Sequence, residues 1–215
     1  MVLIAGIDEA GRGPVIGPLV IAITVIEEDN EGKLREIGVR DSKLLSPKQR
    51  EAMFGPVSKL CKHEIIIIEP KEIDAAVESE SSNLNWLEAD KAVILINNLR
   101  PDIAFIDCPS NNIQAYTEYI RERLDYKPKL VVEHKADVTY PIVSAASILA
   151  KVTRDTQIDR LKQRHVVNFG SGYPADPLTQ EFLKEHWKEY SFFRKSWAAW
   201  KNAANAKKQK SLGEF

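Results

Sequence analysis

The chain has 215 residues, 44% of them hydrophobic and 28% charged, and a formal net charge of -1 at pH 7. This length can bury a full core, as one domain or as one domain with a small appendage. The net charge argues neither for nor against nucleic acid as a partner, because a bulk value hides any local basic groove. Cys61 and Cys108 have neither disulfide-framework nor zinc-ligand spacing, and no segment is long enough to span a bilayer. We therefore expect a globular, cytoplasmic protein with no membrane association.

The order of the predicted elements indicates an α/β fold. Apolar, β-branched runs predict strands near residues 2–8, 18–26, 63–69, 102–107 and 129–133. Helical spacing and capping residues predict helices near residues 47–61, 83–99, 111–124, 142–164, 178–190 and 196–206. The short, glycine-rich link after the first strand favours antiparallel pairing with the second. The whole predicts a mixed five-stranded sheet flanked by helices, followed by a small C-terminal helical domain.

Carboxylates stand at the ends of three predicted strands. Asp8 and Glu9 end the first, Asp107 ends the fourth, and Asp137 lies just after the fifth. Acids at such strand ends could converge at the edge where open α/β sheets place their sites. Unpaired acids at close range raise one another's pKa, and a divalent cation such as magnesium or manganese removes that conflict. The pattern predicts a metal-dependent enzyme that acts on phosphates.

The acidic pair at the end of the first strand needs a local irregularity to act together. Adjacent side chains on a regular strand point to opposite faces, so Asp8 and Glu9 share a site only if the chain turns or bulges there. Gly11 and Gly13 make a turn cheap and let a ligand approach the backbone closely. The structural alternative is a polar strand end followed by a tight turn.

The other candidate residues also have structural interpretations. Asp107 could cap the next helix, and Asp137 could form a surface salt bridge with Lys135. Ser144 and Ser147, in a small, apolar stretch that predicts close packing of a helix on the sheet, are expected to pack or cap. They are not expected to act as nucleophiles, because no histidine partner is suggested.

Five motifs follow one another along the chain. They are residues 8–13 (DEAGRG), 41–46 (DSKLLS), 106–107 (ID), 133–137 (EHKAD) with 144–151 (SAASILAK), and 170–177 (GSGYPADP). This series resembles the type 2 ribonuclease H, or ribonuclease HII, family over residues 3 to 200, and its wording is most similar to the archaeal branch. The resemblance implies an RNase H-like catalytic domain at residues 1–165, a C-terminal helical domain at 166–207 and a tail at 208–215.

The resemblance also implies an activity and its catalytic residues. The family cleaves the RNA strand of RNA–DNA hybrids, and duplex DNA 5′ of a single ribonucleotide, leaving 5′-phosphate and 3′-hydroxyl ends. Those reactions serve primer removal and ribonucleotide excision repair. The family's metal-binding, catalytic acids correspond to Asp8, Glu9, Asp107 and Asp137, which would hold two Mg²⁺ or Mn²⁺ ions about 4 Å apart, with Asp8 bridging them. A monomer is expected.

Substrate recognition is assigned by the same resemblance. The backbone of Gly11, Arg12 and Gly13 and the Tyr173 hydroxyl would contact the ribose 2′-hydroxyl, and the Tyr173 ring would stack on the next deoxyribose. Lys43 would contact a phosphate. On residue type alone, Tyr173 could instead cover the core, and Arg12 and Lys43 could be solvated cations.

The C-terminal residues form a separate motif. Residues 209–215 have the form Gln-x-x-Leu-x-x-Phe, which resembles the peptide by which replication proteins dock on the sliding clamp. In a short 3₁₀ turn, Leu212 and Phe215 would project together into an apolar pocket while Gln209 bonds at its rim. The usual second aromatic is missing. The alternatives are a frayed terminus or residues added for expression.

Two rival functions use some of the same residues. A resolvase or transposase of the same superfold would also cluster carboxylates around two metals, but it would not need the ribose-reading glycine turn and Tyr173. A non-catalytic, hybrid-binding clamp adaptor is the second rival, and the four intact acids argue against it.

Overall fold

The structure, a computed structural model, describes residues 1–39 and 45–212, the last six of these by their backbone alone. The chain forms two compact units. The first comprises Met1–Ala10, Val20–Ile67 and Leu84–Thr153, and the second comprises Gly11–Leu19, Ile68–Asn83 and Arg154–Phe215. The predicted domain boundary at residue 165 lies inside the second unit, and the division into domains stays a prediction.

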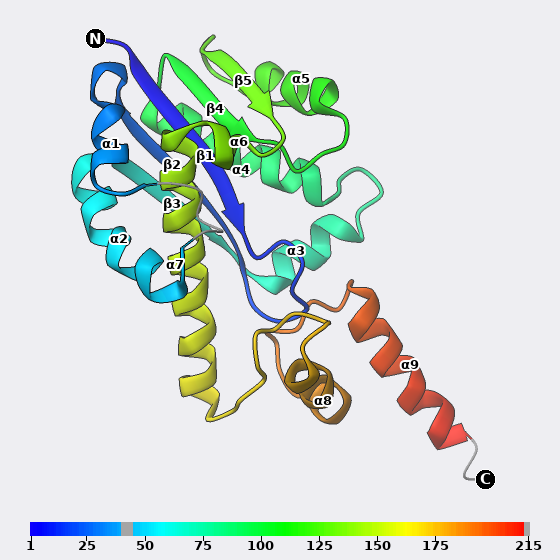
Figure 1. Ribbon diagram of the computed structural model, residues 1–215. Helices are drawn as coiled ribbons and strands as arrows, with labels where there is room; N and C mark the ends of the chain where they lie inside the picture. Colours follow the sequence, from blue (N-terminus) through cyan, green and yellow to red (C-terminus); the bar gives the residue numbers. More distant parts are fainter. Residues whose placement is uncertain (40–44, 213–215) are drawn as a thin grey trace. The chain divides into compact units, whose positions relative to one another are not determined.

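The first unit is built on a five-stranded sheet in the order β3-β2-β1-β4-β5 (Figure 1). The strands are β1 (Leu3–Ala10), β2 (Leu19–Glu27), β3 (Lys62–Ile68), β4 (Ile103–Asp107) and β5 (Lys129–Glu133). β1 and β2 are antiparallel, whereas β1, β4 and β5 are parallel to one another. The predicted mixed sheet and the antiparallel first pair are confirmed.

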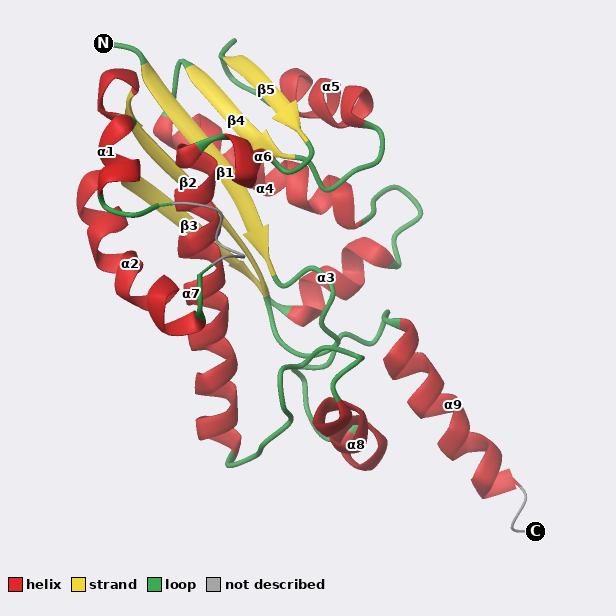
Figure 2. Cartoon of the chain, viewed as in Figure 1, coloured by secondary structure: helices red, strands yellow, loops and turns green. Residues whose placement is uncertain are grey.

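Helices surround this sheet (Figure 2). In the first unit they are α1 (Gly32–Glu36), α2 (Pro47–Leu60), α4 (Leu84–Leu99), α5 (Ile113–Arg123), α6 (Ala136–Thr139) and the first part of α7 (Pro141–His165), with a 3₁₀ turn η1 (Glu28–Asn30). Ser46 begins α2 with a capping box, its hydroxyl accepting from the Gln49 N–H while the Gln49 side chain accepts from the Ser46 N–H. Among the described residues, no helix combines the length and the apolar character needed to cross a membrane.

α7 packs directly on β1. A Cβ atom added to Gly6 would lie 2.3 Å from the carbonyl carbon of Ile142, so only glycine permits this approach. The Thr24 hydroxyl of β2 donates to the Ile142 carbonyl at 2.8 Å. Ile4 and Ala10 of β1 belong to the same buried cluster as the small residues of α7. The predicted close helix–sheet packing is therefore confirmed, and it defines the sheet face that α7 covers.

The second unit has an aromatic core of its own. It contains the rest of α7 together with α3 (Pro70–Val77), α8 (Pro177–His186) and α9 (Ala198–Leu212). Phe169, Phe182 and Phe193 pack in its core with Val15 and Ile16 of the loop that follows β1. An isolated antiparallel bridge joins Ile16 to Phe193. The core therefore holds an N-terminal loop against the C-terminal part of the chain.

Candidate functional site

Three of the predicted acids converge in the first unit. Oxygen atoms of Asp8, Asp107 and Asp137 lie within 4.8 Å of one another. Asp8 and Asp107 are adjacent because β1 and β4 are parallel neighbours, with Ile7 opposite Ile106 one residue earlier. Asp137 reaches the same place from α6, the short helix that follows β5. Asp8 is 4% exposed and Asp137 is 2% exposed, so two of the three carboxylates are removed from water.

The side-chain alternation of the strands explains which acids meet. Phe105 of β4 packs against the same cluster as Ile4 of β1, on the face covered by α7. Asp8 and Asp107 lie an even number of residues from Ile4 and Phe105, so they project from that face too.

Glu9 is not a member of this group of described carboxylates. β1 pairs regularly with β2 through Asp8, Glu9 and Ala10, so the backbone has no turn or bulge at the acidic pair. Glu9, the next residue along the strand, is half-buried. The chain turns only at Gly11, and the role of Glu9 as a ligand stays a prediction.

Asp8 lies in a strongly perturbed electrostatic environment. The pKa of its carboxyl is raised from 3.8 to about 7, chiefly by burial and also by the charge of Asp107, against the hydrogen bond from the Ser147 side chain. Lys151 also opposes the rise, and its ammonium donates to the Ser147 hydroxyl at 2.7 Å. The Glu9 N–H donates to Asp8 Oδ1 at 2.7 Å. Hydrogen-bond donors and Lys151 therefore favour the ionised Asp8 carboxylate, but they do not offset the effects of burial and of Asp107 on its pKa.

Ser147 also belongs to the site, a role that the sequence did not predict for it. It is fully buried on α7, as the expected packing requires, and it also donates a hydrogen bond to the Asp8 carboxylate. The available signal was its spacing of four residues from Lys151, which places both side chains on one helix face.

The structural alternatives for the other two acids are wrong. Asp107 does not cap the following helix, whose N-cap is Asn112. Its Oδ1 instead accepts the backbone N–H of Ala136 at 3.0 Å, which ties β4 to the first residue of α6. Asp137 is buried, which excludes a surface salt bridge with Lys135. Asp107 therefore positions the helix that carries Asp137.

The donor set fits a divalent metal ion. Three carboxylates within 4.8 Å offer hard oxygen ligands from three separate elements. The raised pKa of Asp8 records the conflict that a bound cation would relieve. Asp8, Asp107 and Asp137 are accordingly the residues able to hold such an ion.

The glycine loop, residues 11–18 between β1 and β2, and the Tyr173 loop, residues 170–177, both belong to the second unit, where they meet. Gly11 has φ of +90°, a conformation that other residues rarely adopt. A Cβ atom on Gly13 would lie 3.5 Å from Cε1 of the Tyr173 ring. Tyr173 is 42% exposed, and the Arg154 guanidinium lies 5.2 Å from the centre of its ring. Tyr173 therefore faces the loop and solvent and is not a cover for the core. Arg12 is half-buried.

Several predicted residues cannot be placed. Lys43 and Phe215 lie outside the described residues. The backbone at Gln209 and Leu212 continues α9, which extends beyond its predicted end near residue 206. The clamp-binding motif is therefore described only as the last turn of a helix.

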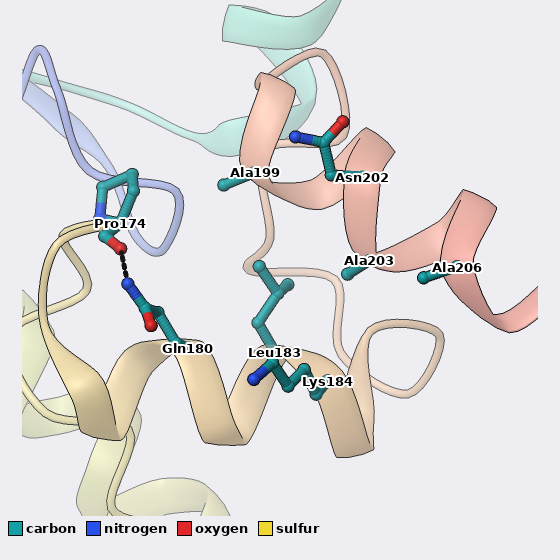
Figure 3. A pocket seen from close by; sticks show the side chains of 8 residues that line it. All are labelled: Pro174, Gln180, Leu183, Lys184, Ala199, Asn202, Ala203 and Ala206. Atoms are coloured by element: carbon teal, nitrogen blue, oxygen red, sulfur yellow. Dashed lines mark hydrogen bonds between the residues drawn. The ribbon is translucent and has the colours of Figure 1, made fainter.

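A pocket of about 620 Å³ lies between α8 and α9 (Figure 3). Leu183, Ala199 and Ala203 supply apolar wall, and the Gln180 amide donates to the Pro174 carbonyl at 2.7 Å. Its described lining contains no carboxylate. The described lining offers no group of acidic, histidine or cysteine ligands, so the acidic cluster remains the candidate catalytic centre.

Comparisons with known proteins agree on one family. The family model for Ribonuclease HII matches residues 5–200. Ribonuclease HII of Pyrococcus horikoshii is 47% identical over 201 residues, which cover 90% of this chain and 89% of that protein. The crystal structure of the ribonuclease H2 from Pyrococcus horikoshii OT3 matches with a TM-score of 0.86 and 43% identity, over 95% of this chain and 98% of that one. The structure of the PCNA:RNase HII complex from Archaeoglobus fulgidus matches with a TM-score of 0.83 and 38% identity, over 94% and 95% of the two chains.

Proposed function

The chain belongs to the ribonuclease HII family, and we propose that it also nicks duplex DNA on the 5′ side of a single ribonucleotide. As a family member it is a ribonuclease H, an endonuclease that acts on RNA–DNA hybrids with divalent metal ions. The observation that carries the proposal is the 3.5 Å approach between the Cβ position of Gly13 and the Tyr173 ring. A glycine backbone beside an exposed tyrosine suits a reader of one sugar edge.

Four carboxylates are proposed to form the catalytic centre. Asp8, Asp107 and Asp137 would hold two Mg²⁺ or Mn²⁺ ions together with Glu9. Bound divalent ions supply an activated water and stabilise charge on the departing 3′ oxygen, which leaves 5′-phosphate and 3′-hydroxyl ends.

The chain's own residues would keep these ligands in place. Ser147, supported by Lys151, donates to Asp8 and favours its ionised form. Asp107 uses one oxygen to hold the N-terminus of α6, so Asp137 cannot move independently of β4. Such preorganisation is what a metal site requires of the groups behind its ligands.

Ribose recognition is proposed for the second unit. The backbone of Gly11, Arg12 and Gly13 would contact the ribose, with the Tyr173 hydroxyl at the 2′-hydroxyl and its ring against the next deoxyribose. Lys43 would contact a phosphate. A resolvase-like or transposase-like nuclease would have no use for this arrangement, and a non-catalytic adaptor would have no use for buried acids.

The sliding clamp is proposed as a protein partner of this chain, which we expect to act as a monomer. The Archaeoglobus fulgidus relative was solved as a PCNA:RNase HII complex, and it is 38% identical to this chain. Gln209, Leu212 and Phe215 would supply the docking peptide. Docking there would bring the enzyme to newly made cytoplasmic DNA for primer removal and ribonucleotide excision repair.

The proposal is tested by cleavage of three labelled duplexes, in Mg²⁺, in Mn²⁺ and with chelator. One carries a single ribonucleotide, one is a long RNA–DNA hybrid, and one is all DNA. We expect metal-dependent cutting of the first two and none of the third. Cutting of the hybrid alone would leave the family activity intact and refute the single-ribonucleotide proposal. Cutting of a four-way DNA junction instead would favour the resolvase-like alternative.

A further inference from the structure

A buried arginine of the second unit holds the glycine loop from behind. Arg194 is fully buried, and its guanidinium donates three hydrogen bonds to backbone carbonyls. Nη2 donates to Gly11 at 2.7 Å, Nη1 to Arg12 at 3.1 Å, and Nε to Gly17 at 2.9 Å. Burying a guanidinium is costly unless its donors are used. Here all three bonds go to one loop, and the Arg194 N–H adds a fourth to the Val15 carbonyl at 2.9 Å.

A tryptophan extends the same arrangement by one residue. Trp197 Nε1 donates to the Gly13 carbonyl at 3.2 Å, and the Arg194 guanidinium lies 4.9 Å from the Trp197 ring. Three consecutive carbonyls, those of Gly11, Arg12 and Gly13, therefore turn toward one C-terminal segment.

The direction of these carbonyls also fixes the direction of the N–H groups in the same peptide units. In a planar trans peptide, the N–H points opposite to the C=O of the same unit. With the Gly11 and Arg12 carbonyls turned to Arg194, the N–H groups of Arg12 and Gly13 must point away from it. The third unit ends in Pro14, which has no N–H. Two successive N–H groups on one side of a loop are an arrangement that binds electron-rich oxygens.

We propose that Arg194 is a positioning residue for ribose recognition, which aims the N–H groups of Arg12 and Gly13 at the ribonucleotide of the substrate. The inference rests on the proposed function, in which this loop reads the sugar. Arg194 itself is buried behind the loop and does not touch substrate. Lysine cannot replace it, because only the planar fork of a guanidinium reaches several carbonyls at once.

The test compares binding to two duplexes that differ in one 2′-hydroxyl. Fluorescence anisotropy with chelator present gives the Kd for a single-ribonucleotide duplex and for its all-DNA counterpart. We expect Arg194→Lys to reduce the preference for the ribonucleotide about tenfold while binding to all-DNA stays unchanged. Trp197→Phe, which removes only the bond to Gly13, should reduce the preference about threefold. Thermal melting shows that each variant is folded.

A matched control separates this role from general support of the unit. Trp200 Nε1 donates to the Trp187 carbonyl at 2.9 Å, away from the glycine loop, so Trp200→Phe should keep the wild-type preference. A wild-type preference in folded Arg194→Lys would overturn the inference, as would equal weakening on both duplexes. If Arg194→Lys does not fold, an unchanged preference in Trp197→Phe overturns it. Wild-type protein without any preference would refute the proposed ribose reading itself.

Discussion

At the scale of single residues, the surroundings of Asp8 favour its protonated form, whereas metal binding requires its ionised form. Burial and the nearby Asp107 raise its pKa to about 7, yet a metal ligand must be ionised. Ser147 and Lys151 favour the ionised form of Asp8, but they do not return its pKa to the ordinary value of 3.8. Metal binding near neutral pH should therefore release a proton, and metal affinity should increase as the pH rises toward the pKa of Asp8.

Replacing Asp8 should make the metal-free protein more stable at alkaline pH while abolishing cleavage. The folded-state pKa of about 7 exceeds the ordinary 3.8, so the folded state binds more protons between these values. The free energy of unfolding of wild type thus falls as the pH rises through that window, by up to about 4 kcal/mol. In chelator, Asp8→Asn should exceed wild type in urea denaturation above pH 7, and this advantage should shrink toward pH 4. An advantage of equal size at both pH values would contradict the assignment.

Ser147→Ala should weaken metal binding without destroying the site. Loss of a group that supports a ligand typically costs about 10–100-fold in metal affinity. The pKa of Asp8 should rise further, because a hydrogen bond to its ionised form is lost. Activity measured against metal concentration should recover at saturation. Ser58→Ala is the control, because the Ser58 hydroxyl on α2 has no hydrogen-bond partner in the described structure. Equal metal affinities in all three proteins would contradict the role of Ser147.

At the scale of elements, the long runs were predictable and the short pieces were not. β1 and β2 were predictable from continuous apolar sequence, and α2 from its cap and proline. α3 was missed because only Glu69 separates Pro70, its first residue, from the apolar run of β3. α6 was missed because it has only four residues, too few for a periodic pattern.

Some features of the candidate site could likewise be predicted from the sequence, and others could not. The meeting of Asp8 with Asp107 follows from strand ends in a parallel pair, so sequence sufficed. The place of Glu9 outside that group of three did not follow from the family resemblance, which assigns it as a ligand with the other acids. The Arg194 bonds join residues more than 170 positions apart, and no local pattern predicts them.

Two glycines give a matched pair for testing the loop. Gly11 has φ of +90°, and an added Cβ would lie 2.8 Å from the Pro18 carbonyl oxygen and from Arg154 Cδ. Gly11→Ala should therefore destabilise the protein by about 1–3 kcal/mol. Gly55 lies within α2 with nothing within 4 Å of its Cβ position, so Gly55→Ala should stabilise by about 0.5–1 kcal/mol. Urea denaturation measures both. A neutral Gly11→Ala would show that the loop conformation is not required by the fold.

At the scale of the whole molecule, hydrolysis and clamp docking should be separable. Leu212→Ala with Phe215→Ala should abolish binding to the sliding clamp, because it removes both apolar anchors of the proposed peptide. Cleavage of a clamp-free duplex should remain at the wild-type rate. Leu178→Ala is the control, since Leu178 is a leucine outside the proposed peptide, 48% exposed on α8. Calorimetry with purified clamp gives the answer, and undiminished binding by the double variant would exclude the tail.

The central claim is hydrolysis by carboxylate-held metal ions at a position chosen by one ribose. Its most direct test maps the cut in a duplex that carries a single ribonucleotide, at nucleotide resolution and with identification of both new ends. We predict a nick on the 5′ side of the ribonucleotide, which keeps a 5′-phosphate, opposite a 3′-hydroxyl on the preceding deoxynucleotide. A nick on the 3′ side ending in a 2′,3′-cyclic phosphate would show that the 2′-hydroxyl itself attacks, and would contradict the proposed roles of the acids and of the glycine loop.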